Sequence, residues 1–324
     1  MRVLERLDEI YAIAQHRAGY SPEEDAAHEL AAGWMRAAGL EAHVDAAGNL
    51  HGSRGTPVVW SGSHLDSVPT AGRFDGALGV VAAIEAAERL PDAPLRIVAF
   101  RAEETGPAGS RRLDERPPAF VELHVEQGPV LERLGEPVGV VTGVAGQTRG
   151  SVVFEGRADH AGTTPMGSRA DALVDAARFV LHVRESARDG AVATVGYVEV
   201  EPNAVNVVPE RVTVSVDARA PTTEQLDALV AAIGYEPTAR FEPVDFSDPP
   251  LAALRAAAPG APELVSGAGH DAMILAAAGV PTAMLFVRSL NGGISHHPDE
   301  LSSVDDIDRA VDVLTAALAR LARR

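Results

Sequence analysis

The stretch PVVWSGSHLDSVPTAGRFDGALGVVAAIEAAERL, residues 57–90, combines an apolar strand pattern, a glycine-rich loop and an apolar helix pattern. Residues 57–64 form a short apolar run that ends at a histidine, which is typical of a buried strand. Residues 76–90 carry apolar side chains at helical spacing and predict a helix. The loop between them presents His64, Asp66 and Asp75. This order predicts an α/β sheet, in which ligands bind at the carboxyl ends of strands.

Two further predicted strands carry ligand-type side chains near their carboxyl ends. Residues 95–104, LRIVAFRAEE, end at a pair of glutamates, and residues 120–128, FVELHVEQG, carry His124. Another candidate, His296, lies on the loop that follows the predicted strand 281–287. Because the strand ends of one sheet meet at a common edge, we expect these side chains to lie close together.

Composition and charge narrow the possible chemistry. The 324-residue chain is 46% hydrophobic, enough for a sizeable core, and its formal net charge of −18 disfavours nucleic acid and acidic membranes as partners. All 28 cationic residues are arginine and cysteine is absent, which excludes a lysine Schiff base, a P-loop lysine, a thiol nucleophile and disulfides. The chain also lacks a G-x-S-x-G motif. Metal or acid–base catalysis by histidine and carboxylate side chains is therefore favoured.

The sequence does not indicate membrane insertion or secretion. The longest apolar stretches, such as residues 76–87, are shorter than the ~20 residues that a membrane span needs. The first ten residues, MRVLERLDEI, carry too many charges for a signal peptide. We therefore expect a cytoplasmic protein.

Five candidate ligands combine three imidazoles with two carboxylates. They are His64, Asp75, Glu104, His124 and His296. Such a mixed set suits two divalent ions that share one carboxylate, and Asp75, on its glycine-containing loop, fits that bridge. Ions of this kind polarise a carbonyl oxygen and lower the pKa of water. Glu103 then fits a general base, and Asp66 fits a residue that orients the His64 imidazole.

Each candidate also has an ordinary structural interpretation. A lone histidine on a strand is usually a core or surface residue, and a glutamate pair after a strand commonly begins a helix. Two polar residues in the second half of the chain have ordinary interpretations as well. Asn206 precedes the residues VVP and could be a turn residue, and Arg219 lies at the end of a predicted strand and could be a surface residue. The remaining histidines that we interpret as structural are His28, His43, His51 and His182. Only the joint placement of five ligand types on one sheet edge favours a site.

The pattern of predicted elements changes after about residue 147. A strand, a helix, two strands, a helix and a strand follow, which is the order of a ferredoxin-like unit. These elements are predicted at residues 148–157, 169–187, 191–201, 210–220, 222–233 and 238–246. We therefore expect residues 148–248 to form a domain inserted into a first domain, which is made of residues 1–147 and 249–324.

Seven motifs in one order resemble a known family. They are GSHLDSVPTAGRFDGALGV, AEE, ELHVEQGPVLE, DHAGTTPM, PNAVNVVPE, SGAGHDA and GGISHHPDE. Together they are similar to the hydantoinase/carbamoylase branch of the M20 metallohydrolases, which contains N-carbamoyl-L-amino-acid hydrolases and allantoate amidohydrolases. The motifs ELHVEQGPVLE and HAGTTPM are specific to that branch, whereas H-x-D alone indicates only the wider peptidase clan.

The resemblance implies a fold and a division of roles. The fold is α/β, a metallopeptidase-like catalytic domain whose mixed central sheet is flanked by helices, with an inserted ferredoxin-like lid that also forms a homodimer. The five ligands would hold two divalent ions per subunit (Zn, Mn, Co or Ni), with Glu103 as general base and His160 stabilising the oxyanion. The implied substrate-binding residues are Gln147, Asn206, Arg219 and Gly293. Of these, Asn206 and Arg219 typically reach across the dimer.

Two of these positions have rival candidates elsewhere in the chain. Arg288 is an alternative anion anchor to Arg219, and His297 is an alternative ligand to His296. The pattern S-H-x-P favours His296 over its neighbour.

One segment departs from the family pattern. Relatives place a longer segment between the glutamate pair and His124 than residues 105–123, whose proline and arginine content predicts a loop rather than helices. In the family this segment builds part of the pocket wall. We predict a metal-dependent amidohydrolase that cleaves the C–N bond of a small linear ureido acid, either an N-carbamoyl-L-amino acid or allantoate. The alternatives are an M20 peptidase or aminoacylase, acting on a dipeptide or an N-acyl amino acid, and a non-catalytic homologue.

Overall fold

The computed structural model describes residues 2–323 and contains two compact units. The large unit combines the chain up to Gly143 with the chain from Asp245 onward, and the small unit is Val144–Val244. Each unit has its own sheet and its own buried core. The small unit is therefore an insertion between two parts of the large unit along the chain.

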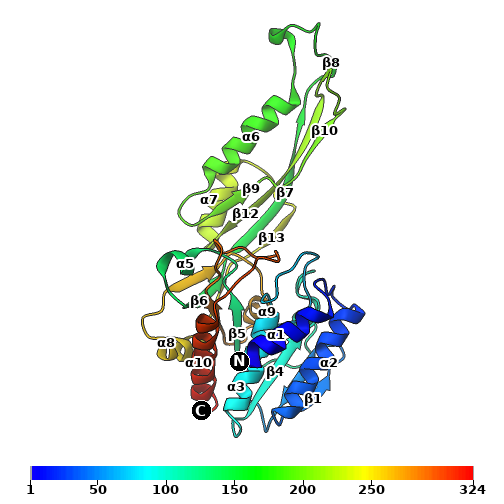
Figure 1. Ribbon diagram of the computed structural model, residues 1–324. Helices are drawn as coiled ribbons and strands as arrows, with labels where there is room; N and C mark the ends of the chain where they lie inside the picture. The colour runs from blue at the N-terminus through cyan, green and yellow to red at the C-terminus, as the bar shows by residue number, and fades with distance from the viewer. Residues whose placement is uncertain (1, 324) are drawn as a thin grey trace. The chain divides into compact units, whose positions relative to one another are not determined.

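A nine-stranded mixed sheet forms the centre of the large unit (Figure 1). Its strands are β1 (Glu41–Val44), β2 (Leu50–Ser53), β3 (Val59–His64), β4 (Leu95–Phe100), β5 (Phe120–Val125), β6 (Val138–Val144), β14 (Val244–Asp245), β15 (Glu263–Ser266) and β16 (Thr282–Val287). The order is β1-β2-β4-β3-β5-β16-β6-β14, with β15 paired to β6. The neighbours β4, β3, β5 and β16 run parallel, so their carboxyl ends share one edge.

Helices flank this sheet, and most of them join one core with it. They are α1 (Arg2–Ile13), α2 (Pro22–Ala37), α3 (Ala77–Arg89), α4 (Ala108–Arg111), α5 (Val130–Leu134), α8 (Pro250–Ala257), α9 (Asp271–Ala277) and α10 (Val304–Leu321). Side chains of α1, α2, α3, α8 and α10 pack with the strands in a single apolar cluster. Helix α3 is buried continuously from Ala77 to Ala87, which explains its lack of a polar face. The large unit is mixed α/β, as predicted.

Alternation along the parallel strands decides which side chains face the helical core. Ile97, Val121 and Leu285 belong to the apolar cluster, whereas their even-numbered neighbours, such as Phe120, do not. Successive side chains of a strand point to opposite faces. The even-numbered His64 and His124 therefore project away from the core that contains α3.

Several elements of the large unit are not apparent from the sequence patterns. The helices α1, α5 and α8 and the strands β6 and β15 were not predicted. The predicted loop 105–123 is partly wrong, because residues Ala108–Arg111 form the one-turn helix α4. Pro107 immediately precedes that turn, where its missing N–H is not needed.

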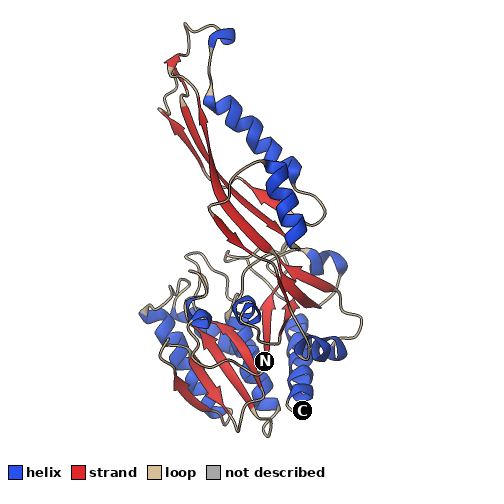
Figure 2. Ribbon diagram, turned by 180° about the vertical axis from the view of Figure 1, so that it is seen from behind, coloured by secondary structure: helices blue, strands red, loops and turns tan. Residues whose placement is uncertain are grey.

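The small unit is a five-stranded antiparallel sheet with two helices (Figure 2). Its elements are β7 (Gly146–Glu155), β8 (Asp159–His160), a 3-10 turn (Met166–Ser168), α6 (Ala172–Ser186), β9 (Val192–Thr194), β10 (Val198–Glu201), β11 (Val207–Val208), β12 (Arg211–Ala220), α7 (Thr223–Ile233) and β13 (Ala239–Phe241). The sheet order is β10-β12-β7-β13, with β9 also paired to β12, while β8 and β11 form a separate ladder. Alternate residues of β12, from Val212 to Ala218, are buried in cores shared with α6 and α7.

Two predicted strands of the small unit are each divided. The predicted strand 191–201 is interrupted between β9 and β10, which both pair with β12. The predicted strand 238–246 is interrupted at Pro243, which lacks the N–H that a ladder requires. Its first part, β13, pairs with β7, whereas its second part, β14, joins the sheet of the large unit.

Within the described residues, none of the helices is both long enough and apolar enough to cross a membrane.

Candidate metal centre

His64 and His124 lie side by side on neighbouring parallel strands. The register pairs Trp60 of β3 with Phe120 of β5, so residues four positions further along reach the same level of the sheet. The two imidazole rings have centroids 5.8 Å apart, and both side chains are buried. The register of two strands therefore brings together two residues that are 60 positions apart in the sequence.

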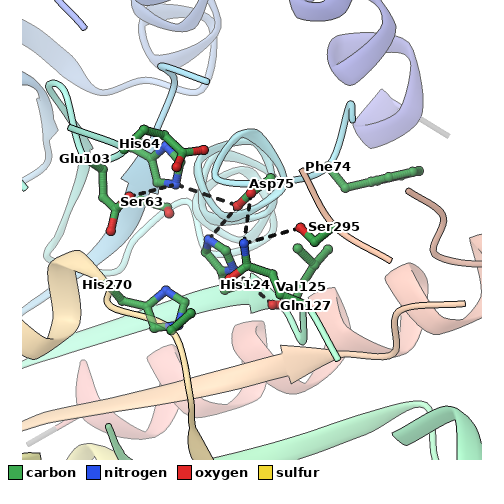
Figure 3. A network of polar contacts seen from close by, with 12 residues as sticks. Ser63, His64, Phe74, Asp75, Glu103, His124, Val125, Gln127, His270 and Ser295 are labelled. Carbon is green, nitrogen blue, oxygen red and sulfur yellow. Dashed lines mark hydrogen bonds and ion pairs between the residues drawn. The ribbon is translucent and has the colours of Figure 1, made fainter. Parts of the chain in front are cut away.

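Asp75 reaches these rings because the loop after β3 turns sharply at Gly76. Gly76 has a φ of +63°, and a Cβ at this position would lie 2.3 Å from the His64 ring. Only glycine permits both this backbone conformation and this close approach. Asp75 Oδ1 lies 3.1 Å from His124 Nε2 and 3.9 Å from His64 Nε2 (Figure 3).

The other carboxylate oxygen of Asp75 faces a second group of donors. Asp75 Oδ2 lies 3.2 Å from His296 Nε2, which in turn lies 3.5 Å from Glu104 Oε2. The His296 side chain is 49% exposed, so this second group is the more accessible one. Asp75 is therefore shared between a buried group with His64 and His124 and an outer group with Glu104 and His296.

The hydrogen bonds of the imidazoles fit a bound cation. His124 Nδ1 lies 2.9 Å from the Val125 carbonyl oxygen, and this oxygen can only accept, so Nδ1 carries the proton. In the neutral ring, Nε2 then directs its lone pair at the Asp75 carboxylate, which is repulsive unless a proton or a metal ion lies between them. Glu104 Oε1 is buried and has no hydrogen-bond partner within residues 2–323. These nitrogen and oxygen donors suit a divalent ion.

In the metal-free chain, protons bound to the imidazole rings supply the positive charge that faces the carboxylates. Burial lowers the pKa of His64, but neighbouring carboxylates, first that of Asp66, outweigh it and raise this pKa well above its usual range. The pKa of His124 is also raised, because its contact with Asp75 outweighs the effect of burial. Burial opposes ionisation of Asp75, yet the facing imidazoles hold its pKa well below the usual range. The cluster thus attracts cations.

Asp66 positions the glutamate pair. The backbone N–H groups of Glu103 and Glu104 donate to Asp66 Oδ1 and Oδ2 at 3.0 and 3.1 Å. Asp66 Oδ1 also lies 3.2 Å from His64 Nδ1, and Glu103 Oε2 lies 3.9 Å from His64 Nε2. Burial raises the pKa of Glu103 well above its usual range, which suits a carboxylate that accepts a proton near neutral pH.

A third set of donors, Glu122, His124 and His270, also lies within range of a common ion. The protein already uses these donors. Glu122 accepts hydrogen bonds from the Ser63 hydroxyl at 2.7 Å and from a backbone N–H at 2.9 Å, and His270 Nε2 lies 2.8 Å from Ser266 Oγ. Burial lowers the pKa of His270 well below its usual range, so its ring is neutral. We assign this set to internal hydrogen bonding.

The two groups that share Asp75 are the arrangement of a metallohydrolase, and comparison with known proteins identifies the family. The family model described as "Peptidase family M20/M25/M40" matches residues 60–320. The chain belongs to the M20 family. This family is metal-dependent, in agreement with the His, Asp and Glu groups described above.

Characterised relatives of this M20 chain match it over nearly its full length. An N-carbamoyl-L-amino-acid amidohydrolase from Paenarthrobacter aurescens is 34% identical over 95% of this chain and 93% of its own length. An allantoate amidohydrolase from Escherichia coli is 35% identical over 94% of this chain and 92% of its own length. A hydantoinase/carbamoylase family amidase from Burkholderia multivorans has a TM-score of 0.89 at 31% identity, covering 100% of this chain and 98% of its own. These matches confirm the resemblance drawn from the seven motifs.

The M20 chain is nevertheless shorter than its relatives within the matched region. The match with the Paenarthrobacter aurescens protein extends over 385 positions, more than the 324 residues of this chain. The relative therefore contains segments that this chain lacks.

In the small unit, Gln147 and Arg219 lie directly opposite each other on β7 and β12. Both contact one carboxylate, because Gln147 Nε2 donates to Asp217 Oδ2 at 2.7 Å and Arg219 Nε donates to Asp217 Oδ1 at 2.9 Å. A carboxylate cannot donate, so the Gln147 amide must direct its NH2 group at Asp217. Its carbonyl oxygen is therefore left as an acceptor.

His160 and Asn206 form a second pair at the other end of the small unit. His160 pairs with Val207 in the β8–β11 ladder, and the Asn206 carbonyl accepts the N–H of Ala161 at 2.9 Å. Both residues are exposed. Gln147 is the second residue of β7, and His160 lies beyond the far end of this strand, so the rise of ~3.4 Å per strand residue places the two pairs about 30 Å apart. Asn206 and Arg219, which the resemblance groups together, therefore lie at opposite ends of one unit.

The rival candidates are engaged elsewhere. Arg288 Nε and Nη2 donate hydrogen bonds of 2.9 Å to the carboxylate of Asp306, which engages one edge of the guanidinium group. His297 Nδ1 accepts the backbone N–H of Asp299 at 3.2 Å, whereas His296 is the ring that faces Asp75.

Gly293 is required for the path of its loop. It has a φ of +75°, and a Cβ there would lie 2.1 Å from the carbonyl carbon of Gly128. A side chain at this position would therefore separate the loop that carries His296 from the segment after β5.

The histidines interpreted as structural lie outside the metal-binding groups of the described residues. His51 Nε2 lies 3.0 Å from Asp45 Oδ2, His43 stacks on His51, and His182 Nε2 lies 2.8 Å from the Ala232 carbonyl oxygen. His28 is buried in α2, and its two ring nitrogens have no hydrogen-bond partner within residues 2–323, although Nε2 lies 3.9 Å from Glu24 Oε1.

Sequence reasoning assigned no role to Gln127, Ser295 and Glu300. Gln127 Nε2 donates to Asp75 Oδ2 at 2.9 Å and to Ser295 Oγ at 3.3 Å, and Glu300 contacts the Asp75 loop. All three lie inside the motifs ELHVEQGPVLE and GGISHHPDE, which was the available signal.

Proposed function

We propose that this M20 chain is a metal-dependent amidohydrolase that cleaves the C–N bond of a linear ureido acid, of the N-carbamoyl-L-amino acid or allantoate type. The observation that carries this proposal is the Asp75 carboxylate, which faces two groups of donors with Glu103 nearby. The names of relatives at 34% and 35% identity support the substrate class.

Two ions would share Asp75 in this proposal. His64 and His124 would hold one of them, and Glu104 and His296 the other. When bound, such ions polarise the ureido carbonyl and lower the pKa of water. Zn, Mn, Co and Ni all accept imidazole and carboxylate ligands.

Glu103 would act as the general base. Its carboxylate takes a proton from the attacking water and passes it to the leaving nitrogen, so that the C–N bond breaks without an amide anion. Breakage of this first C–N bond leaves a carbamic acid, whose spontaneous loss of carbon dioxide breaks the second C–N bond, so the products are the amine, ammonia and carbon dioxide. Two observations support this role. The raised pKa of Glu103 suits a group that accepts a proton, and the hydrogen bond from its backbone N–H to Asp66 fixes the position of the residue.

We infer that the small unit is a ferredoxin-like lid, with residues 148–248 as its sequence-based bounds, and that it forms a homodimer. Its strand order and its two helices on one sheet support the fold. His160 would stabilise the oxyanion, and closure of the lid would exclude water from the site. The substrate would be held by Gln147, Asn206, Arg219 and Gly293, with Arg219 suited to a substrate carboxylate.

The separation of the two pairs in the small unit supports the dimer. One small ureido acid cannot contact both His160 and Gln147 of the same unit across about 30 Å. Two copies solve this geometry, because one end of a lid can serve its own chain and the other end its partner's. Only one of Asn206 and Arg219 would then reach across the dimer.

An ammonia-release screen tests the proposed function. The purified chain is loaded with Mn, Co or Zn and incubated with allantoate and with N-carbamoyl, N-acetyl and dipeptide forms of several amino acids. We expect ammonia from ureido compounds and no hydrolysis of the acetyl or dipeptide forms. The reverse pattern would indicate a peptidase or aminoacylase. A chain that binds no metal and hydrolyses nothing would indicate a non-catalytic homologue.

A further inference from the structure

Glu300 lies four residues after His296, and its buried carboxylate joins two loops of the large unit. Oε2 accepts the backbone N–H groups of Phe74 and Asp75 at 2.9 and 3.1 Å. Oε1 accepts the hydroxyl of Ser295 at 2.9 Å. One side chain thus contacts the loop that carries Asp75 and the residue that precedes His296.

The packing around Glu300 leaves it no alternative position. A Cβ added at Gly72 would lie 2.4 Å from both Cβ and Oε2 of Glu300, so the Asp75 loop passes directly against this side chain. Glu300 is only 5% exposed, and both of its carboxylate oxygens are hydrogen-bonded. A buried carboxylate with all of its hydrogen bonds inside the protein is a precise structural link.

The hydrogen bonds continue to the third ligand segment. A carboxylate only accepts, so the Ser295 hydroxyl donates its proton to Glu300 and accepts the N–H of Gln127 at 3.3 Å. The other N–H of the Gln127 amide donates to Asp75 Oδ2 at 2.9 Å. The ring Glu300–Ser295–Gln127–Asp75 is therefore closed. It connects the loops that hold Asp75 and His296 with the segment that follows His124.

We propose that Glu300 is a positioning residue for the metal centre, which sets the distance between Asp75 and His296 and so tunes the affinity of the outer donor group for its ion. This inference rests on the proposed function, because it assumes that Asp75 and His296 bind metal. Glu300 faces the backbone of one ligand and the neighbour of another. Outer groups of this kind typically change metal affinity by about 10–100-fold when they are removed.

Zinc affinity tests this role without any substrate. The Zn²⁺ dissociation constant is measured by competition with a chelating dye for the wild-type chain, Glu300→Ala and Glu300→Gln, each shown to be folded by circular dichroism. We expect Glu300→Ala to bind about 10–100-fold more weakly. The amide introduced by Glu300→Gln can accept both backbone N–H groups and donate to Ser295 Oγ, so this variant should stay within about threefold of wild type.

Glu132→Ala is the matched control. Glu132 also holds the loop that carries His296, since its Oε2 accepts the N–H of Gly292 at 2.8 Å, but it does not contact Asp75. We expect this variant to keep wild-type zinc affinity within about threefold, well short of the loss that removing a ligand's partner causes. Loss of affinity equal to that of Glu300→Ala would overturn the proposal, because general anchoring of the loop would then explain both results.

Ser295→Ala covers the case in which Glu300→Ala does not fold. It removes one hydrogen bond of the ring and leaves Glu300 bound to the Asp75 loop. We expect zinc binding to weaken by about 3–10-fold, a smaller loss than full removal of the outer partner. Unchanged zinc affinity in Ser295→Ala, or in a folded Glu300→Ala, would contradict the proposal. Failure of the proposed function is distinct, because the wild-type chain itself would then release no ammonia from any ureido acid.

Discussion

The large unit gathers its candidate ligands into one cluster, whereas the small unit keeps its candidate residues in two pairs about 30 Å apart, one exposed (His160 and Asn206) and one half-buried (Gln147 and Arg219). In the large unit, His64, Asp75 and His124 are buried, and hydrogen bonds fix each ring. In the small unit, His160 and Asn206 lie in a short two-stranded ladder open to solvent. All five candidate ligands of the cluster lie within the large unit, whereas the pairs of the small unit belong to no such cluster in the described residues.

Under the proposed function, this contrast predicts that the two units would contribute to the reaction in different ways. A preorganised cluster can bind ions and poise a base without any movement, because its geometry is set by strand register and by glycine turns. In the proposal, the residues at the two ends of the small unit's sheet would contribute only when the lid closes over a site. Changes in the cluster should therefore alter metal content and chemistry, and changes in the small unit should alter catalysis while metal content stays intact.

The largest expected effect separates the two adjacent glutamates of the cluster. Glu103→Gln should lower the ammonia-release rate by about 10²–10⁴-fold, the usual contribution of a general base, while the metal content stays that of wild type. Glu104→Ala should instead lose metal, because it removes a ligand. Rates and metal analysis of both variants test this division. Equal metal loss in Glu103→Gln and Glu104→Ala would contradict it.

The second expected effect concerns the two residue pairs of the small unit. His160→Ala should slow turnover by about 10²–10³-fold, as removal of an oxyanion donor does, without loss of metal. Arg219→Ala should mainly raise KM, since a charged hydrogen bond to a substrate carboxylate contributes about 1.5–3 kcal/mol. Steady-state kinetics and metal analysis of each variant measure both effects.

Mixing the same two variants tests whether opposite ends of a lid serve different sites. In mixed dimers of His160→Ala and Arg219→Ala, one site receives two intact pairs and the other receives none. Activity should then recover to about one quarter of wild type, from half the dimers having one working site of two. The presence of mixed dimers is verified with two affinity tags. Absence of recovery would then show that both pairs of one chain serve the same site.

A smaller effect is expected on stability. Metal at 100 times its dissociation constant should stabilise the large unit by about 2.7 kcal/mol and leave the small unit unchanged. In the metal-free chain, the raised pKa values of His64 and His124 contribute stability that is present below about pH 6.5 and lost as pH rises through those values. Calorimetry between pH 6 and 8, with and without Zn²⁺, checks both statements. Bound zinc keeps these rings unprotonated in the folded chain, so a loss of stability with rising pH that persists in the zinc-loaded protein would contradict the assignment.

The smallest effect comes from His28, a buried histidine of the large unit outside the cluster. Burial is the main cause that lowers its pKa to about 3, so the folded chain keeps it neutral while the unfolded chain protonates it below about pH 6.5. The contribution of His28 to stability should therefore fall by about 1 kcal/mol as pH falls from 7 to 5.5, and the difference in stability between wild type and His28→Leu should change with pH by this amount. Urea unfolding of both proteins measures it. Burial by itself lowers the pKa of a histidine, as at His28. At His64 and His124 the facing carboxylates outweigh burial and raise the pKa.

Much of the candidate site could be predicted from local patterns. The strand that ends at His64, the helix after Asp75 and the strand that carries His124 each have a period that the sequence displays directly. The motif order led to the family, which the comparisons confirm. The weaker predictions concern segments without a clear period, such as the one-turn helix α4 and the division at Pro243.

The sequence was sufficient to predict the main strands and the helix around the site and the side chains that could bind metal or transfer a proton, because backbone periodicity and side-chain chemistry are local properties. Two relations are visible only in the folded chain. The second part of the predicted strand 238–246, β14, pairs in the sheet of the large unit, and Arg219 lies opposite Gln147 rather than near Asn206. The tertiary structure also decided that Glu300 joins the Asp75 loop to Ser295. These relations depend on strand register and loop packing between distant segments, whose energies arise only when the chain is folded.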